Sequence, residues 1–210
     1  MIKCIAHELK EHIPFTALGA LTGIILMVIV VSGNIPQHIS HTIFHTLHPV
    51  HVLLSALVTT SMYMRYKKGN IGVAILIGWT GSIGIATISD ALIPHLGGIL
   101  LQIDMGKPHI PFIEHWWINL IALAGIAIGY WRQTTKIPHL GHVLISTWAS
   151  LFYIMTFGII ADWLPLLPFI FLILFLAVWI PCCLSDIVYP LLFLGKEPEF
   201  PSPERRGSAS

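Results

Sequence analysis

Residues 48–55 read HPVHVLLS and open an apolar run long enough to enter a membrane. Residues 139–146 read HLGHVLIS and repeat that pattern at five of eight positions. In each copy the two histidines are three residues apart and the serine follows one helical turn later, so all three side chains share one helix face. Imidazoles on a helix that enters lipid are costly and indicate a function. We therefore take this repeated motif as the basis for predicting the fold.

The composition is that of a membrane protein. The chain is 55% hydrophobic and 10% charged, with a mean hydropathy of +0.81, whereas soluble domains carry about 25% charged residues. We predict an all-α polytopic protein of the cell membrane, in contact with the lipid bilayer. The net charge of +1 and the lack of a basic stripe argue against nucleic acid as a partner. The three cysteines form no secreted disulfide pattern.

Hydropathy predicts six membrane-spanning helices. They cover approximately Ile13–Ser32, Pro49–Met64, Ile71–Pro94, Trp116–Trp131, Leu140–Ala161 and the proline-kinked Leu164–Leu194. With the N-terminus in the cytoplasm, ten of the eleven lysines and arginines face the cytoplasm and only Lys107 faces outside. The positive-inside rule therefore predicts that both termini are cytoplasmic. Residues 196–210 are rich in proline, serine and charge, and we predict a disordered tail.

Two further motifs recur in the same order as the histidine motif, which indicates an internal duplication. They are Glu11-His12 with Glu114-His115, and Ser89-Asp90 with Ser185-Asp186, each Ser-Asp pair being followed by a proline four residues after the aspartate. We predict one repeat over residues 1–100 and another over 101–195. Three spans per repeat make the two copies inverted in the membrane. An insertion near 34–47, which carries His38, His41 and His45, is predicted to be an amphipathic surface helix.

Topology and duplication together predict two pseudo-symmetric metal sites on opposite sides of the membrane. The outer site would contain His48, His51, Asp90, Glu114 and His115, supported by Ser55 and Ser89; the inner site would contain His139, His142, Asp186, Glu11 and His12, supported by Ser146, Ser185 and Cys182. Histidine and carboxylate ligands together suit Zn²⁺, Fe²⁺, Mn²⁺ or Ni²⁺. The thiol of Cys182 would make the inner site softer.

Three functions agree with such sites. We expect a transporter or channel for a divalent transition metal ion, with Zn²⁺ or Fe²⁺ first, rather than an enzyme. One alternative is an intramembrane zinc hydrolase acting on a lipid amide or ester. Another is a di-haem electron-transfer protein, in which His51 would pair with His115 and His142 with His12. The same polar groups could also serve only to hold the fold together. The sequence does not decide whether the chain forms a homo-oligomer.

Overall fold

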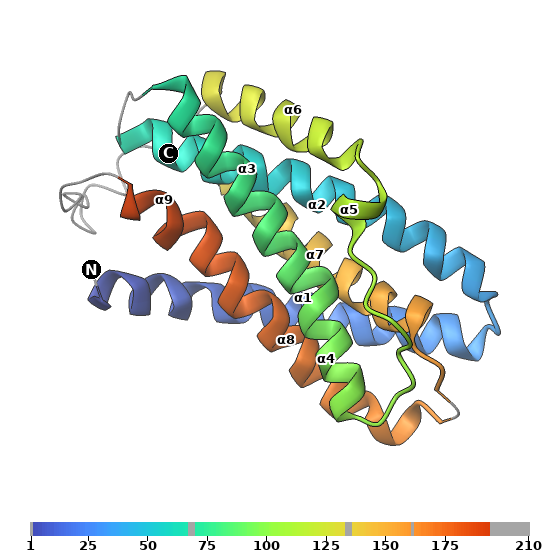
Figure 1. Ribbon diagram of the computed structural model, residues 1–210. Helices are drawn as coiled ribbons and strands as arrows, with labels where there is room; N and C mark the ends of the chain where they lie inside the picture. The colour runs from blue at the N-terminus through green and yellow to red at the C-terminus, as the bar shows by residue number, and fades with distance from the viewer. Residues whose placement is uncertain (1, 67–69, 133–135, 161, 194–210) are drawn as a thin grey trace.

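The computed structural model describes residues 2–66, 70–132, 136–160 and 162–193, and these residues form helices and no strand (Figure 1). The α-helices are α1 Ile2–Ser32, α2 Gln37–Tyr66, α3 Ile71–Thr87, α4 Ile93–Leu100, α5 Pro111–Glu114, α6 Ile118–Trp131, α7 Lys136–Phe157, α8 Leu167–Cys183 and α9 Tyr189–Leu192. Two π-helices, η1 Ile88–Leu92 and η3 Leu184–Val188, and one 3₁₀ turn, η2 Leu164–Leu166, complete the elements. The predicted tail 196–210 lies outside the described residues.

The predicted all-α membrane class is confirmed in its broad form. Among the residues that the structure describes, four helical stretches are long and apolar enough to cross a bilayer, namely His12–Ser32, Gln37–Arg65, Ile71–Leu100 and Leu164–Cys182. Ile118–Trp131 and Gly141–Phe157 are shorter apolar helices. The segment near 34–47 differs from our expectation, because residues 37–47 form the first turns of α2 instead of a separate surface helix. Its inward face is held by packing, since Ser40 and Phe44 are buried.

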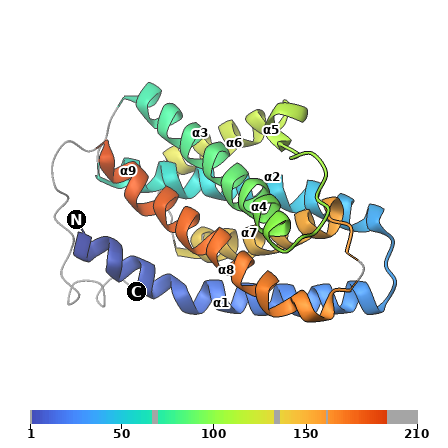
Figure 2. The same ribbon diagram turned by 60° about the horizontal axis from the view of Figure 1, so that its bottom comes forward.

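Helices α2 and α7 pack along each other at the centre of the bundle (Figures 1 and 2). Helix α2 also packs against α3 and α6, whereas α7 packs against α1 and α8. The approach of α6 to α2 depends on two glycines. A Cβ on Gly125 would lie 2.4 Å from the backbone oxygen of Leu53, and one on Gly129 would lie 2.5 Å from that of Leu57. Only glycine therefore allows this spacing between the two helices.

Each Ser-Asp motif lies in a π-helix that precedes a proline. In the first, the amide of Ile93 donates to the carbonyl of Ile88, five residues earlier. In an ordinary α-helix the ring of Pro94 would clash with the carbonyl four residues before it, and Pro94 has no amide hydrogen to donate to that carbonyl. The wider π-helical turn avoids this clash. The freed carbonyl of Ser89 accepts instead from the hydroxyl of Ser150 on α7, at 2.9 Å. The second motif lies in η3, in the same relation to Pro190.

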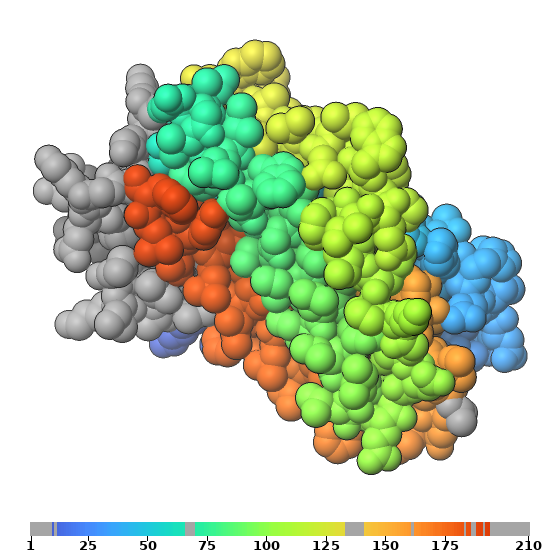
Figure 3. Space-filling model, viewed as in Figure 1, coloured from blue at the N-terminus to red at the C-terminus, as the bar shows by residue number. Residues whose placement is uncertain are grey.

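The bundle has an apolar exterior. Along α1, the exposed side chains Leu18, Leu21, Ile25 and Ile29 are each more than half exposed and follow helical spacing. Helix α8 has an equivalent stripe beginning at Phe169. Figure 3 shows α8 lying beside α3 and α4 on the surface. Exposed apolar stripes of this kind are compatible with a lipid environment.

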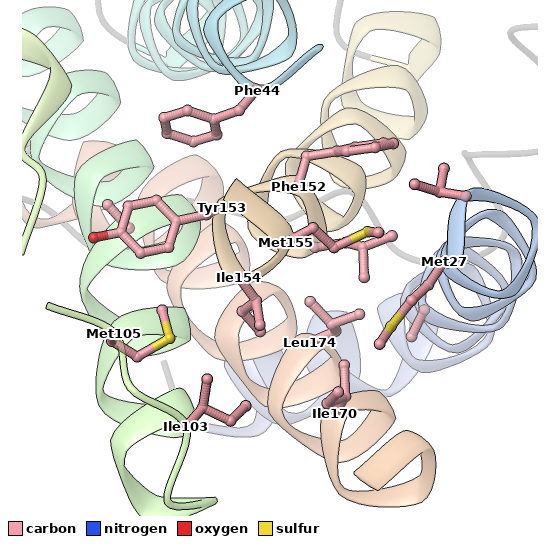
Figure 4. Close-up of a cluster of buried hydrophobic side chains, with 14 residues drawn as sticks. Met27, Phe44, Ile103, Met105, Phe152, Tyr153, Ile154, Met155, Ile170 and Leu174 are labelled. Carbon is pink, nitrogen blue, oxygen red and sulfur yellow. The ribbon is translucent and has the colours of Figure 1, made fainter. Parts of the chain in front are cut away.

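The interior holds one large apolar cluster and many polar side chains. The cluster contains Met27, Phe44, Ile154, Ile170 and Leu174, which come from α1, α2, α7 and α8 (Figure 4). It lies toward the end of the bundle at which α1 meets α2 and α7 meets α8. Polar groups are instead buried along the line between α2 and α7. A buried polar group is tolerated only when it is hydrogen bonded, so the polar side chains between α2 and α7 must have partners there.

Candidate functional site

Asp90 is the centre of a buried hydrogen-bond network. Its carboxylate is fully buried in η1, and Oδ2 accepts from Nδ1 of His48 at 2.9 Å and from Nδ1 of His51 at 2.7 Å. The other oxygen, Oδ1, accepts from the hydroxyls of Ser89 and Ser146, each at 2.8 Å. Four donors from α2, η1 and α7 therefore surround one carboxylate. This saturation is what allows an acidic group to be buried there.

The network defines the tautomer of both imidazoles. A short contact between Nδ1 and a carboxylate oxygen requires hydrogen on that nitrogen, because two lone pairs would repel each other. In the neutral rings, Nε2 of His48 and Nε2 of His51 are then acceptors that point away from Asp90. Imidazoles that bind metals are held by a carboxylate in this same way, through the nitrogen opposite the metal. The arrangement thus presents two oriented nitrogen ligands inside the bundle.

Residues that we assigned to the inner site lie on this same cluster, which corrects the prediction of separate inner and outer sites. We expected His142, Ser146 and Cys182 on the opposite side of the membrane from Asp90. Instead, Ser146 donates to Asp90, and the ring centroid of His142 lies 5.3 Å from that of His51. Because α2 and α7 pack along their length, equivalent residues near the middle of both helices meet at the centre of the bundle.

A second cluster, the histidine triad, consists of His45, His109 and His115. One nitrogen from each ring lies within 4.8 Å of the other two. His45 comes from α2, and the other two come from the connection between α4 and α6. Nε2 of His45 and Nε2 of His109 are buried and have no hydrogen-bond partner among the described residues. Three imidazole nitrogens this close can bind one transition metal ion after a small inward movement.

Glu114 orients one member of the triad. Its carboxylate pairs with Nδ1 of His109 and also accepts from the backbone amide of Ile110. Partial burial and the neighbouring His115 lower the pKa of His109 below its ordinary value of 6.5, while the Glu114 carboxylate opposes that shift. The neutral ring that a metal requires is thus favoured at neutral pH. As in the Asp90 cluster, a carboxylate bound to Nδ1 leaves Nε2 on the opposite side of the ring as the nitrogen that can bind a metal.

The placement of Glu114 and His115 differs from our expectation. Both were predicted beside Asp90, but His115 packs against His45 at a ring-centroid distance of 5.0 Å and Glu114 pairs with His109. The reason is that α5 ends at Glu114 and α6 begins only at Ile118, so these residues belong to a connection rather than to the start of a membrane helix. This connection passes the N-terminal part of α2, where His45 lies.

The remaining predicted residues are distributed along the bundle. His12 is buried within α1, which begins at Ile2, so the first Glu-His pair does not start a helix. Ser55 is buried one turn beyond His51. Ser185 donates to the carbonyl of Gly81 at 3.1 Å, and so joins η3 to α3. The side chains of Glu11, His139 and Asp186 lie outside the part that the structure describes.

Sequence reasoning missed two members of the triad. His45 was assigned to the polar face of a surface helix, although its spacing of three residues from His48 places both on neighbouring turns of α2. His109 was not among the predicted ligands, and nothing in its local sequence indicates the triad. His95, which was also not among the predicted ligands, is buried beside the hydroxyl of Tyr153.

No family model, characterised protein or solved structure matches the chain, so the geometry itself is the basis for any functional conclusion.

Proposed function

We propose that this protein is an integral membrane transporter for a divalent transition metal ion. The observation that carries the proposal is the sequence of ligand groups along one membrane-spanning helix. His45 belongs to the histidine triad, and His48 and His51 follow on the next two turns of α2, bound to the buried Asp90. From His45 to His51 the helix rises about 9 Å. An ion would therefore find one group of ligands at the end of α2 and another inside the bundle.

Transport requires sites that bind an ion well enough to admit it and weakly enough to release it. The triad supplies neutral imidazoles near the end of the bundle, and the Asp90 cluster supplies a negative charge and two further imidazoles inside. Phe44 lies against both groups, with ring centroids 5.1 Å from His45 and 5.7 Å from His48. We propose that the ion passes the Phe44 ring when it moves between them.

An inverted repeat supports the transporter reading. In our proposal α1, α2 and α3–α4 correspond to α6, α7 and α8–α9. The packing agrees with this correspondence, because α2 pairs with α3 and α6 just as α7 pairs with α8 and α1. The two π-helices also occupy corresponding places before Pro94 and Pro190. Inverted repeats with broken helices near the site are common in secondary transporters. We retain the proposed cytoplasmic location of both termini from the distribution of basic residues.

The hydrolase alternative has one observation in its favour. A three-histidine group is also the ligand set of some catalytic zinc sites, and Glu114, which pairs with His109, places a carboxylate beside this group. The predicted haem pairs have less support, since His51 lies against Asp90 and His142 while His115 lies against His45. Hydrolysis of a lipid ester by the zinc-loaded protein in detergent would favour the enzyme.

Metal uptake into proteoliposomes tests the proposal. The full chain is reconstituted, a fluorescent chelator is enclosed, and Zn²⁺, Fe²⁺ or Mn²⁺ is added outside. We expect uptake with the native protein, and at least a tenfold slower rate with H45A or with D90N. The matched control is H38A, because His38 lies on the same helix but is exposed. Equal rates for native protein and D90N, with both correctly folded, would refute the proposal.

A further inference from the structure

Helices α3 and α6 form an apolar groove on the surface of the bundle. The two helices pack side by side (Figure 1). The groove has a volume of about 180 Å³ and is lined by Ile71 and Ile75 of α3 and by five residues of α6 between Leu123 and Trp131. Its lining is apolar except for the polar atoms of Tyr130 and Trp131. An apolar surface of this shape fits a hydrocarbon chain.

Two tryptophans indicate where the groove lies relative to the bilayer. Trp131 is 82% exposed at one end of α6, and Trp116 is 70% exposed just before the other end. Exposed tryptophans of membrane helices gather at the level of the lipid headgroups. Helix α6 has 14 residues and so rises about 21 Å, which is less than the roughly 30 Å of a hydrocarbon core. The groove therefore lies directly beneath the headgroups at the Trp131 end, where lipids must adapt to a short helix.

Two exposed arginines lie at this end of the bundle. Arg132 directly follows Trp131, and its backbone carbonyl accepts from the hydroxyl of Ser61 on α2 at 3.3 Å. Arg65 lies one turn beyond Ser61, so α2 brings Arg65 to the same end as Arg132. Among the residues that the structure describes, neither guanidinium pairs with a carboxylate. Two positive charges beside an apolar groove are complementary to a lipid with a negative headgroup.

We infer that the groove between α3 and α6 binds one acyl chain of an anionic phospholipid, with the phosphate against Arg132 and Arg65. Such a lipid site is independent of metal transport. A groove of this volume accepts an acyl chain, whereas a helix of a second copy, about 10 Å across, can only lie over it. Guanidinium groups bind phosphate through paired hydrogen bonds. The proposed cytoplasmic location of this end agrees with the anionic lipids of that leaflet.

Native mass spectrometry of the full chain in detergent tests this site with two probe lipids that have the same acyl chains. Phosphatidylglycerol has a negative headgroup, whereas phosphatidylcholine has no net charge. We expect the native protein to retain phosphatidylglycerol with an apparent affinity at least about fivefold higher, because each basic side chain near an anionic headgroup contributes roughly that factor. R65Q/R132Q should bind both lipids equally. The matched control K107Q should keep the preference, since Lys107 is exposed in the connection between α4 and α5 and does not line the groove.

Filling the groove separates chain binding from charge. Ala127 lines the groove, so the indole of A127W should occupy it and displace the retained lipid. The matched control is A124W, because Ala124 is exposed on the same helix but does not line the groove. Circular dichroism checks that both variants keep the native helix content. Equal retention of both lipids by the native protein, or lipid retention by A127W equal to that of A124W, would overturn the lipid site. A native dimer that A127W dissociates would also overturn it, since a second copy would then cover the groove.

Discussion

Replacing Asp90 tests how the buried cluster is held together. D90A removes the acceptor of four hydrogen bonds at once. The two serine hydroxyls can turn toward carbonyl groups of their own helices, and Ser89 already lies 3.4 Å from the carbonyl of Ala86. The Nδ1 hydrogens of His48 and His51 then remain without an acceptor. At about 1–3 kcal/mol for each unsatisfied buried donor, we expect D90A to destabilise the fold by about 4 kcal/mol.

D90N separates hydrogen bonding from charge. The asparagine oxygen can accept from both imidazoles, and its amide group can donate to the serine oxygens, which act as acceptors equally well. Only the charge assistance is lost, and the cost of burying a charge disappears with it. We therefore expect D90N to cost about 1–2 kcal/mol, since charged hydrogen bonds exceed neutral ones by roughly 1 kcal/mol each.

Reversible unfolding in mixed detergent micelles, followed by tryptophan fluorescence, measures these differences. The matched control is D104A, because the side chain of Asp104 is exposed and its carboxylate accepts from the nearby amide of Gly106. It should change the free energy of unfolding by no more than about 0.5 kcal/mol. If D90A unfolded like D104A, or if D90N were as unstable as D90A, the four-donor account of this cluster would be wrong.

Two further predictions concern helix packing and pH. G125A should destabilise the fold by about 1–3 kcal/mol, because its Cβ would meet the backbone oxygen of Leu53 at 2.4 Å. In the same unfolding assay G84A should not destabilise the fold, since a Cβ there meets no neighbouring heavy atom within 4 Å and alanine forms helices better than glycine; equal losses for both variants would contradict this account of the packing. E114Q should lower the pKa of His109 further, since the Glu114 carboxylate opposes the effect of burial. A histidine with a lowered pKa loses stability as pH falls through its unfolded value of about 6.5, so metal-free E114Q should lose more stability than native protein between pH 7.5 and pH 5.5. An unchanged histidine titration in NMR spectra would refute this.

Much of the helical organisation could be predicted from hydropathy and spacing. All six predicted spans overlap observed apolar helices, because runs of apolar residues must form helices if they are to satisfy their backbone groups in lipid. The boundaries were less predictable. Residues 37–47 were assigned to a surface helix because their polar histidines concealed the buried positions of Ser40 and Phe44.

The partners of the ionisable side chains could be predicted only in part. His48, His51 and Asp90 were expected together, and the structure brings them together through one carboxylate oxygen. The position of Glu114 was not predictable, because a short connection between helices has no periodicity that reveals its direction. The same holds for His109, which reaches His45 only through the path of the chain between α4 and α6.

The amino-acid sequence by itself determined that this chain forms apolar helices long enough to cross a membrane, and which faces of α2 and α7 carry imidazole and hydroxyl groups. Helical periodicity fixes the angle of a side chain around its own axis, and lipid requires that such groups turn inward. Tertiary structure alone decided that Ser146, His142 and Cys182 meet the Asp90 cluster, and that three histidines gather at the end of α2. The depth at which two helices cross depends on packing over their whole length, such as the close approach at Gly125, and no local pattern contains that information.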